Sequence, residues 1–272
     1  MTAWADRFRV QPGAALDLAA IDPGATPGAP GDKAATKPAT KALTERLGEL
    51  QERLWAEGSR SLLVVLQAMD TGGKDGTIRK VFRGCSPLGV RVAAFGAPSE
   101  EERAHDPLWR VHAKAPRDGE VVIFNRSHYE DVLVVRVKGL VPEAQWGARF
   151  DHFVQWERML ADEGTTIVKI MLHISREEQR ERLQRRLDRA DKRWKFRLGD
   201  LDDRALWPQF QHAYQEALAR TSTAWAPWHV VPADHKWYRD YAIASLLVEV
   251  LEGMDPRFPE APEDLEGVVV GE

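Results

Sequence analysis

The alternation of short apolar runs with stretches of helical periodicity is the feature that most constrains the fold. The apolar runs occupy residues 61–67, 89–95, 119–125, 165–175 and 228–233. Strands that are apolar throughout are buried on both faces, and helices between them indicate a parallel sheet that is covered on both sides. We therefore predict an α/β fold, with a three-layer arrangement of a parallel sheet between helices.

This prediction also says where functional residues should be sought. Ligands of open parallel sheets bind beyond the carboxyl ends of the strands. Polar residues that directly follow an apolar run are therefore the first candidates for a functional site.

The flanking segments divide the chain into three parts. Residues 1–42 are rich in Pro, Gly, Ala and Thr, so we predict an extended N-terminal arm with little helix or strand. The arm is expected either to be a mobile tail or to pack on its own domain or on a partner subunit. Leucines at helical spacing predict a helix that ends near Gly58. The main domain is predicted over residues 43–254, with a C-terminal tail at 255–272.

Composition excludes several classes of protein. A formal net charge of −4 and a pI of about 6.1 give no basic field for nucleic acid. Cys85 is the single cysteine, which excludes an intrachain disulfide and a C-x-x-C zinc site. We see no signal peptide, and the apolar runs are too short to span a bilayer. We therefore expect a cytoplasmic protein without nucleic-acid or membrane partners.

The segment MDTGGKDGT directly follows the first predicted strand and precedes a helical pattern. Its glycines allow backbone amides to converge on an anion, and the helix dipole and Lys74 add positive charge. The alternative is a glycine-rich turn with a surface lysine. The predicted phosphate-binding residues here are Gly72, Gly73, Lys74, Asp75, Gly76 and Thr77.

This loop departs twice from the pattern G-x-x-x-x-G-K-[ST], with Ala68 at the first glycine and Asp75 at the hydroxyl position. Asp75 at the first turn of a helix is favoured by the dipole and need not face phosphate. Whether it contacts a metal or merely begins a helix stays open. Asp70 is then the expected metal ligand.

A second polar motif, FNRSHYED, begins where the third apolar run ends. Arg126 offers a charge-assisted donor to a phosphoryl group. A capped loop with an internal ion pair is the alternative. His128 alone is not predicted to be a metal ligand.

A basic run occupies residues 176–197, with ten basic and five acidic residues. Wound as one helix, it places Arg182, Arg186, Arg189 and Arg193 in one sector, where they repel unless an anion meets them. We predict an anion-binding lid helix, with a solvated charged helix as the alternative. After the last apolar run, Asp234, His235 and Lys236 are weaker candidates for ligand contact or support.

Four motifs in this order resemble the polyphosphate kinase 2 family. They are MDTGGKDGT, FNRSHYEDVLVVRV, RRLDRADKRWKF and TSTAWAPWHVVPADHKWYR, and the resemblance runs from Phe8 to Arg239. It implies a phosphate-loop kinase-like domain, related to thymidylate kinase, with a helical lid at 176–204. It also implies reversible transfer of a phosphoryl group from inorganic polyphosphate to ADP and AMP, forming ATP and ADP, with Mg²⁺. We expect that Mn²⁺ can substitute for Mg²⁺.

The resemblance also assigns residues by position. Asp70, Lys74 and Arg126 are the implied catalytic residues, Asn125, Arg126 and Glu130 bind nucleotide, and Asp70 and Glu130 hold the metal. The resemblance assigns polyphosphate contacts to Arg83, Arg185, Arg186, Arg189, Lys192 and Lys195, and the arginine sector adds Arg182. Two departures from the family pattern are Asn125, where other subgroups carry Asp, and Gly96, where Lys is expected.

The lead hypothesis is thus a polyphosphate-driven nucleotide kinase. An ATP-dependent nucleoside or nucleotide kinase and a non-catalytic polyphosphate- or nucleotide-binding regulator remain alternatives. The retained Asp70, Glu130 and Asp131 argue against the regulator. The arm and the ten tryptophans favour a homo-oligomer.

Overall fold

A five-stranded parallel sheet forms the centre of the computed structural model, which describes residues 3–262, 268 and 270. The strand order is β2-β3-β1-β4-β5. Every residue of β1 is buried, and Val64 pairs with Ile123 on one side and Val168 on the other. The strands are β1 Ser61–Ala68, β2 Val90–Ala94, β3 Val121–Asn125, β4 Thr165–His173 and β5 Trp228–Pro232. The predicted parallel sheet is confirmed, with each strand inside or close to its apolar run.

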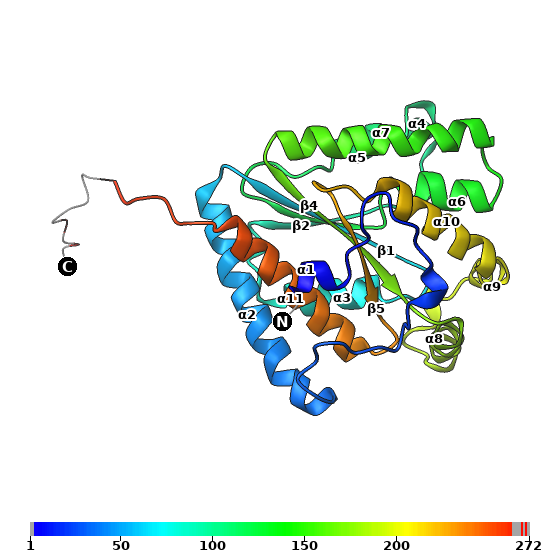
Figure 1. Ribbon diagram of the computed structural model, residues 1–272, viewed down its shortest axis with the longest axis horizontal. Helices are drawn as coiled ribbons and strands as arrows, with labels where there is room; N and C mark the ends of the chain where they lie inside the picture. The colour runs from blue at the N-terminus through cyan, green and yellow to red at the C-terminus, as the bar shows by residue number, and fades with distance from the viewer. Residues whose placement is uncertain (1–2, 263–267, 269, 271–272) are drawn as a thin grey trace.

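Helices cover both faces of this sheet, as the three-layer prediction requires (Figure 1). On one side lie α1 Trp4–Arg7, α2 Lys33–Glu57, α3 Lys74–Val81 and α11 Lys236–Met254. On the other side lie α5 Trp109–His112, α6 Glu130–Val137, α7 Glu143–Asp162 and α10 Trp207–Thr221. The remaining helices are α4 Glu100–Ala104, α8 Arg176–Asp188 and α9 Gly199–Ala205, with 3-10 turns η1 Leu18–Ala20, η2 Phe82–Gly84 and η3 Arg193–Lys195.

The N-terminal arm packs on its own domain. Val10 N donates to Trp228 O and Val230 N to Phe8 O, so the arm continues the sheet beyond β5. Further along, Asp234 N donates to Pro23 O. Of the two alternatives for the arm, the structure therefore shows the packed one.

The arm is shorter than predicted, because α2 begins at Lys33 and not near residue 43. The Asp32 side chain accepts from the amides of Ala34 and Ala35 and caps the helix. The alanine-rich sequence favours helix, although Pro38, the sixth residue of the helix, lacks the N–H that would donate to Ala34 O. The composition of residues 33–42 predicts an extended chain, but the cap and the alanines make this segment the start of a helix.

The basic run is not one continuous helix, so the predicted arginine sector is wrong in its geometry. α8 ends at Asp188, and Arg189 adopts an extended conformation. Arg193 lies in the turn η3, after which the chain enters α9. Both helices lie at one end of the sheet (Figure 1).

The last helix, α11, stops at Met254, the residue before the predicted C-terminal tail begins. Part of the predicted tail, residues 263–267, 269, 271 and 272, lies outside the described residues. In the portion of the chain with a described structure, no helix combines the length and apolar character needed to cross a membrane.

Candidate active site

The loop between β1 and α3 owes its shape to a mutual fit of Ala68 and Gly72. A Cβ on Gly72 would collide with the Cβ of Ala68, so the missing glycine of the motif is matched by a glycine four residues later. Thr71 has φ 64° and Gly73 has φ 109°, and a positive φ is strained for a residue with a side chain. The loop is therefore held in a conformation that its own sequence does not favour, as is common where backbone must face a ligand.

A cleft of about 830 Å³ opens over this loop, and we call it the loop cleft. Basic residues outnumber acidic ones along its wall by twelve to three. The basic residues are Lys74, Arg79, Arg126, Arg182, Arg185, Arg186, Arg189, Lys192, Lys195, Arg197, Lys236 and Arg239. Such a surplus of positive charge in one concavity favours a polyanion.

Lys74 lies at the floor of the loop cleft, where its Nζ donates to Ala68 O at 3.0 Å. Burial lowers the pKa of Lys74, and the nearby Arg126 lowers it further. An arriving anion would favour the protonated form and could take two of the three ammonium donors.

Two predicted phosphate contacts lie outside this cleft. Thr77 is fully buried, and its Oγ1 has no hydrogen-bond partner in the described part of the chain. Arg83 is exposed in η2 and does not line the loop cleft. Nine residues of helical rise place Arg83 about 13 Å from Lys74. The structure therefore does not bring Thr77 and Arg83 to the loop cleft, because α3 turns one inward and carries the other away, and their phosphate contacts stay predictions.

Asp70 and Arg126 meet at the junction of the first two motifs. Arg126 Nη2 donates to Asp70 Oδ1 at 3.0 Å, and its Nη1 lies 3.6 Å from Glu130 Oε2. Glu130 and Asp70 raise the pKa of Arg126, whereas burial raises the pKa of Glu130. Arg126 itself has φ 64°, a second strained backbone at the site. Arg126, which we predict to contact a phosphoryl group, thus also forms the internal ion pair that was the alternative hypothesis for this motif.

Asp75 connects three motifs. Its Oδ1 accepts from Asn125 Nδ2 at 3.0 Å and its Oδ2 from Lys195 Nζ at 2.9 Å. Although burial opposes it, these two hydrogen bonds lower the pKa of Asp75. Asn125 therefore presents its amide donor here, and Asp75 joins the loop to the lid.

Arg182 differs from the other basic residues of α8. All five of its N–H groups are paired: Nε donates to Glu178, Nη1 to Thr71 O and Gly72 O, and Nη2 to Ala233 O and Asp234 O. Its side chain is 5% exposed. Although Arg182 lines the loop cleft, we assign it to holding the loop, because a phosphate would have to displace one of these carbonyls.

The other lid cations are partly or fully exposed and paired with nearby carboxylates. Arg185 contacts Glu178, Arg186 contacts Asp200, and Arg189 and Lys192 contact Asp191. An exposed pair such as Arg189–Asp191 contributes about 0–1 kcal/mol, so a polyanion can replace it at little cost. The structure brings Arg185, Arg186, Arg189, Lys192 and Lys195 to the loop cleft, as predicted.

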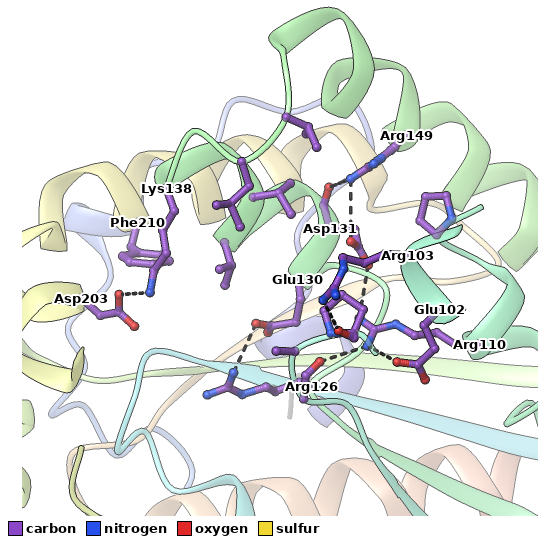
Figure 2. Close-up of a pocket in the computed structure, with 18 of the residues that line it drawn as sticks. Glu102, Arg103, Arg110, Arg126, Glu130, Asp131, Lys138, Arg149, Asp203 and Phe210 are labelled. Carbon is purple, nitrogen blue, oxygen red and sulfur yellow. Dashed lines mark hydrogen bonds and ion pairs between the residues drawn. The ribbon is translucent and has the colours of Figure 1, made fainter. Parts of the chain in front are cut away.

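A second pocket, of about 900 Å³, lies on the other side of Asp70 and Arg126. Figure 2 shows Asp131 between Arg149 and Arg110, and Lys138 paired with Asp203 at 2.7 Å. Its wall carries seven acidic and six basic side chains and includes apolar residues such as Phe210. This balance suits a ligand with an apolar body and a few polar groups better than a long polyanion.

Behind the second motif lies a fully buried polar cluster. Glu157 accepts from Lys169 Nζ at 2.5 Å and from Tyr129 OH at 2.9 Å, and lies 3.2 Å from His128 Nε2. Lys169 also donates to Thr221 O at 2.7 Å. All of the side chains at Glu157, Lys169, His128 and Tyr129 are 0% exposed. His128 is thus a structural residue that helps to fix the loop between Arg126 and Glu130.

Several residues of the site escaped the sequence analysis. Arg110 and Arg149 lie within helices, so a search after strand ends could not find them. Arg239 lies in the first turn of α11, three residues beyond the predicted Lys236, which does line the loop cleft. Of the other two weaker candidates, Asp234 accepts from Ser175 N and His235 stacks near Trp237.

The donor set at the junction fits Mg²⁺ in one specific way. No cluster of three or more metal-ligating side chains occurs among residues 3–262, 268 and 270. Mg²⁺ is commonly held by one or two carboxylates together with phosphate oxygens and water. Asp70 lines both cavities and Glu130 lines the second pocket, so a site completed by substrate phosphates fits these two carboxylates.

Comparison with known proteins gives concordant results. The family model described as "Polyphosphate kinase 2 (PPK2)" matches residues 31–259. An AMP/ADP-polyphosphate phosphotransferase of Meiothermus ruber is 56% identical over 97% of this chain and 99% of its own length. An ADP-polyphosphate phosphotransferase of Rhodopseudomonas palustris is 39% identical over 79% of each chain. A crystal structure of polyphosphate kinase 2 from Arthrobacter aurescens superposes with a TM-score of 0.92 at 45% identity, covering 96% of this chain and 93% of that one.

Proposed function

We propose that this chain, which belongs to the polyphosphate kinase 2 family, transfers the terminal phosphoryl group of inorganic polyphosphate to ADP and to AMP, reversibly, forming ATP and ADP. One observation carries the proposal beyond family membership. Two cavities of opposite character, the loop cleft and the second pocket, share Asp70 and Arg126 on their walls. A donor in one and an acceptor in the other would meet there.

The loop cleft is the donor side. Its surplus of basic residues extends from Lys74 in the loop to Lys195 in the lid, which suits a long chain of phosphates. Asp191, the carboxylate paired with Arg189 and Lys192, is exposed, so polyphosphate can exchange for it.

The second pocket is the acceptor side. Its balanced charges and apolar residues suit the nucleoside, with the nucleotide's terminal phosphate directed toward Arg126 (Figure 2). Arg126 can donate to this phosphate and to the transferring group, because its guanidinium lines both cavities.

The chemistry requires alignment and neutralisation of charge. A phosphate oxygen of ADP or AMP forms the new P–O bond to the terminal phosphorus, while the bond to the bridging oxygen of polyphosphate breaks and leaves the chain one unit shorter. The nucleophile is already an anion, so no side chain must remove a proton. Lys74 and Arg126 stabilise the charge of the transition state. Mg²⁺, when held by Asp70 and Glu130, neutralises further charge on phosphate oxygens.

The choice of donor tests this function. The protein is incubated with ADP or AMP and Mg²⁺, with either inorganic polyphosphate or ATP as donor, and nucleotide products are separated. We expect ATP from ADP, and ADP from AMP, with polyphosphate alone. A product that requires ATP would indicate an ATP-dependent kinase, and tight polyphosphate binding without turnover would indicate a regulator.

Two further predictions accompany this function. We expect the protein in the cytoplasm, because its proposed substrates include the nucleotides AMP and ADP. Self-association stays a prediction that rests on the tryptophans, of which Trp55, Trp109 and Trp194 are exposed, since the arm packs on its own domain. Light scattering after size-exclusion chromatography measures it.

A further inference from the structure

Arg239 is a buried arginine beside the loop with part of its guanidinium unused. Its side chain is 3% exposed, and Nε and Nη2 both donate to Asp240 Oδ1, at 2.9 and 2.6 Å. Nη1 has no hydrogen-bond partner within the described ranges of the chain. Arg239 nevertheless lines the loop cleft. Nη1 is not fully enclosed by protein, so it reaches the open cleft, where an anion can take the place of water as its partner.

The glycines of the loop show where this guanidinium lies. A Cβ on Gly73 would collide with Arg239 Nη1, and a Cβ on Gly76 would come within 3.3 Å of Nη2. The guanidinium therefore lies against the backbone at the start of α3, where the loop amides and Lys74 face the cleft. The glycines of the motif leave room for an arginine from another element as well as for phosphate.

Arg182 is the informative comparison. The two guanidinium groups are neighbours, since each lies near the same point above Gly73. All five N–H groups of Arg182 are paired within the protein, whereas Arg239 retains both N–H groups of Nη1. Lys236 adds a third positive charge, and its pKa is lowered by burial and by neighbouring arginines. These three cations face two local carboxylates, Asp240 and Glu178, so the group keeps a net positive charge.

We propose that Arg239 is a donor-side binding residue, whose Nη1 group donates to a phosphoryl oxygen of the polyphosphate held by the loop. This inference rests on the proposed function and deepens it, because it adds α11 to the loop and the lid as a third element that binds the donor. The contact belongs to the polyphosphate side, since Arg239 lines the loop cleft and not the second pocket.

The test measures KM for polyphosphate and for ADP in Arg239→Gln and Arg239→Lys. Loss of a charge-assisted hydrogen bond predicts a roughly tenfold or larger rise in KM for polyphosphate in Arg239→Gln. KM for ADP is expected to stay within about twofold, and Arg239→Lys to recover part of the loss. Arg158→Gln, an exposed arginine of α7 paired with Asp162, is the matched control and should change neither constant.

A merely structural role would give a different pattern. If Arg239 only packs α11 against the loop at Gly73 and Gly76, Arg239→Gln will lower the melting temperature and kcat while both KM values stay near wild type. That result, or equal rises in the two KM values, overturns the proposal.

Direct binding separates this proposal from the proposed function. Inorganic tripolyphosphate is titrated calorimetrically into wild type and Arg239→Gln without nucleotide. Weaker binding by the variant supports the contact even if wild type transfers no phosphoryl group, which would sink the proposed function alone. Equal binding by the two proteins overturns the contact even if wild type is active.

Discussion

The loop cleft and the buried cluster around Glu157 lie on either side of the second motif. They differ in how far the charged side chains are paired within the protein. In the cluster, Lys169 is fully buried, and its ammonium donates to Glu157, Tyr129 and Thr221 O. In the loop cleft, twelve basic residues face three acidic ones, and Arg239 keeps an unpaired Nη1 among the described residues. The cluster satisfies its charges internally, whereas the cleft leaves charge for a ligand.

This difference indicates what each region contributes. A buried ion pair is strongly destabilising when one partner is removed, because the other charge stays buried. Charges at a concave surface cost little when unpaired in water and become useful when an anion arrives. We therefore expect changes in the cluster to alter stability and changes in the cleft to alter activity.

The largest expected effect is on stability, from Lys169→Met. Removing the ammonium leaves Glu157 without its buried counter-charge, at a cost of roughly 3–5 kcal/mol in the free energy of unfolding. Urea denaturation measures this loss. The double variant Glu157→Gln, Lys169→Met should recover part of it, because no charge is then left unpaired. If Lys169→Met is as stable as wild type, the buried cluster does not have the stabilising role that distinguishes it from the loop cleft.

Lys74→Ala should produce the opposite pattern. Loss of one cationic contact to the transferring group is expected to lower kcat/KM by roughly 10²–10³, or about 3–4 kcal/mol. The denaturation midpoint should stay near that of wild type, because the Lys74 side chain makes a single hydrogen bond, to Ala68 O, and water in the cleft can replace it in the variant. Polyphosphate-dependent ATP formation close to wild type would remove Lys74 from the catalytic residues.

Asp75→Asn tests whether the junction of loop, second motif and lid competes with the donor. Since Asp75 pairs with Lys195 in the half-exposed lid, its neutralisation should release this lysine for phosphate. We expect a decrease of up to about threefold in KM for polyphosphate, the size of an exposed ion pair. The Mg²⁺ dependence should shift in Asp70→Asn and not in Asp75→Asn; a shift in the latter would make Asp75 a metal-sphere residue.

The smallest effect concerns Glu57, at the end of α2. Hydrogen bonds from Arg60, working against burial, lower the pKa of Glu57 to about 2 from its ordinary value of 4.5. A lowered pKa stabilises the fold above the unfolded value, and this contribution is lost as the pH falls from about 4.5 to 2. Denaturation midpoints of wild type and Glu57→Gln should thus differ at pH 6 and converge at lower pH. A constant difference across this range would contradict the assignment.

The sheet could be predicted because its signal is local. Five apolar runs of strand length are enough to indicate buried parallel strands, and the strand ends then lead to Lys74 and Arg126. The boundary at residue 42 was wrong because Asp32 begins the helix, and a cap is a single residue that composition does not reveal.

The sequence does not show in the same way which arginine N–H groups are paired within the protein and which stay available to a ligand. Arg182 and Arg239 are both basic residues near motif positions, yet their hydrogen bonds depend on carbonyl and carboxylate groups brought together by the fold. The helical winding of the basic run was extended past Asp188, where the chain leaves the helix. Arg110 and Arg149 reach the second pocket from helices, and no strand end precedes them.

The central claim is that the positive surplus of the loop cleft binds the polyphosphate donor, and the salt dependence of KM tests it most directly. KM for polyphosphate and KM for ADP are measured with wild type between low and physiological ionic strength. Because several cations contact the polyanion together, KM for polyphosphate should rise steeply with salt and KM for ADP only slightly. Equal, shallow dependence of both constants would contradict the account.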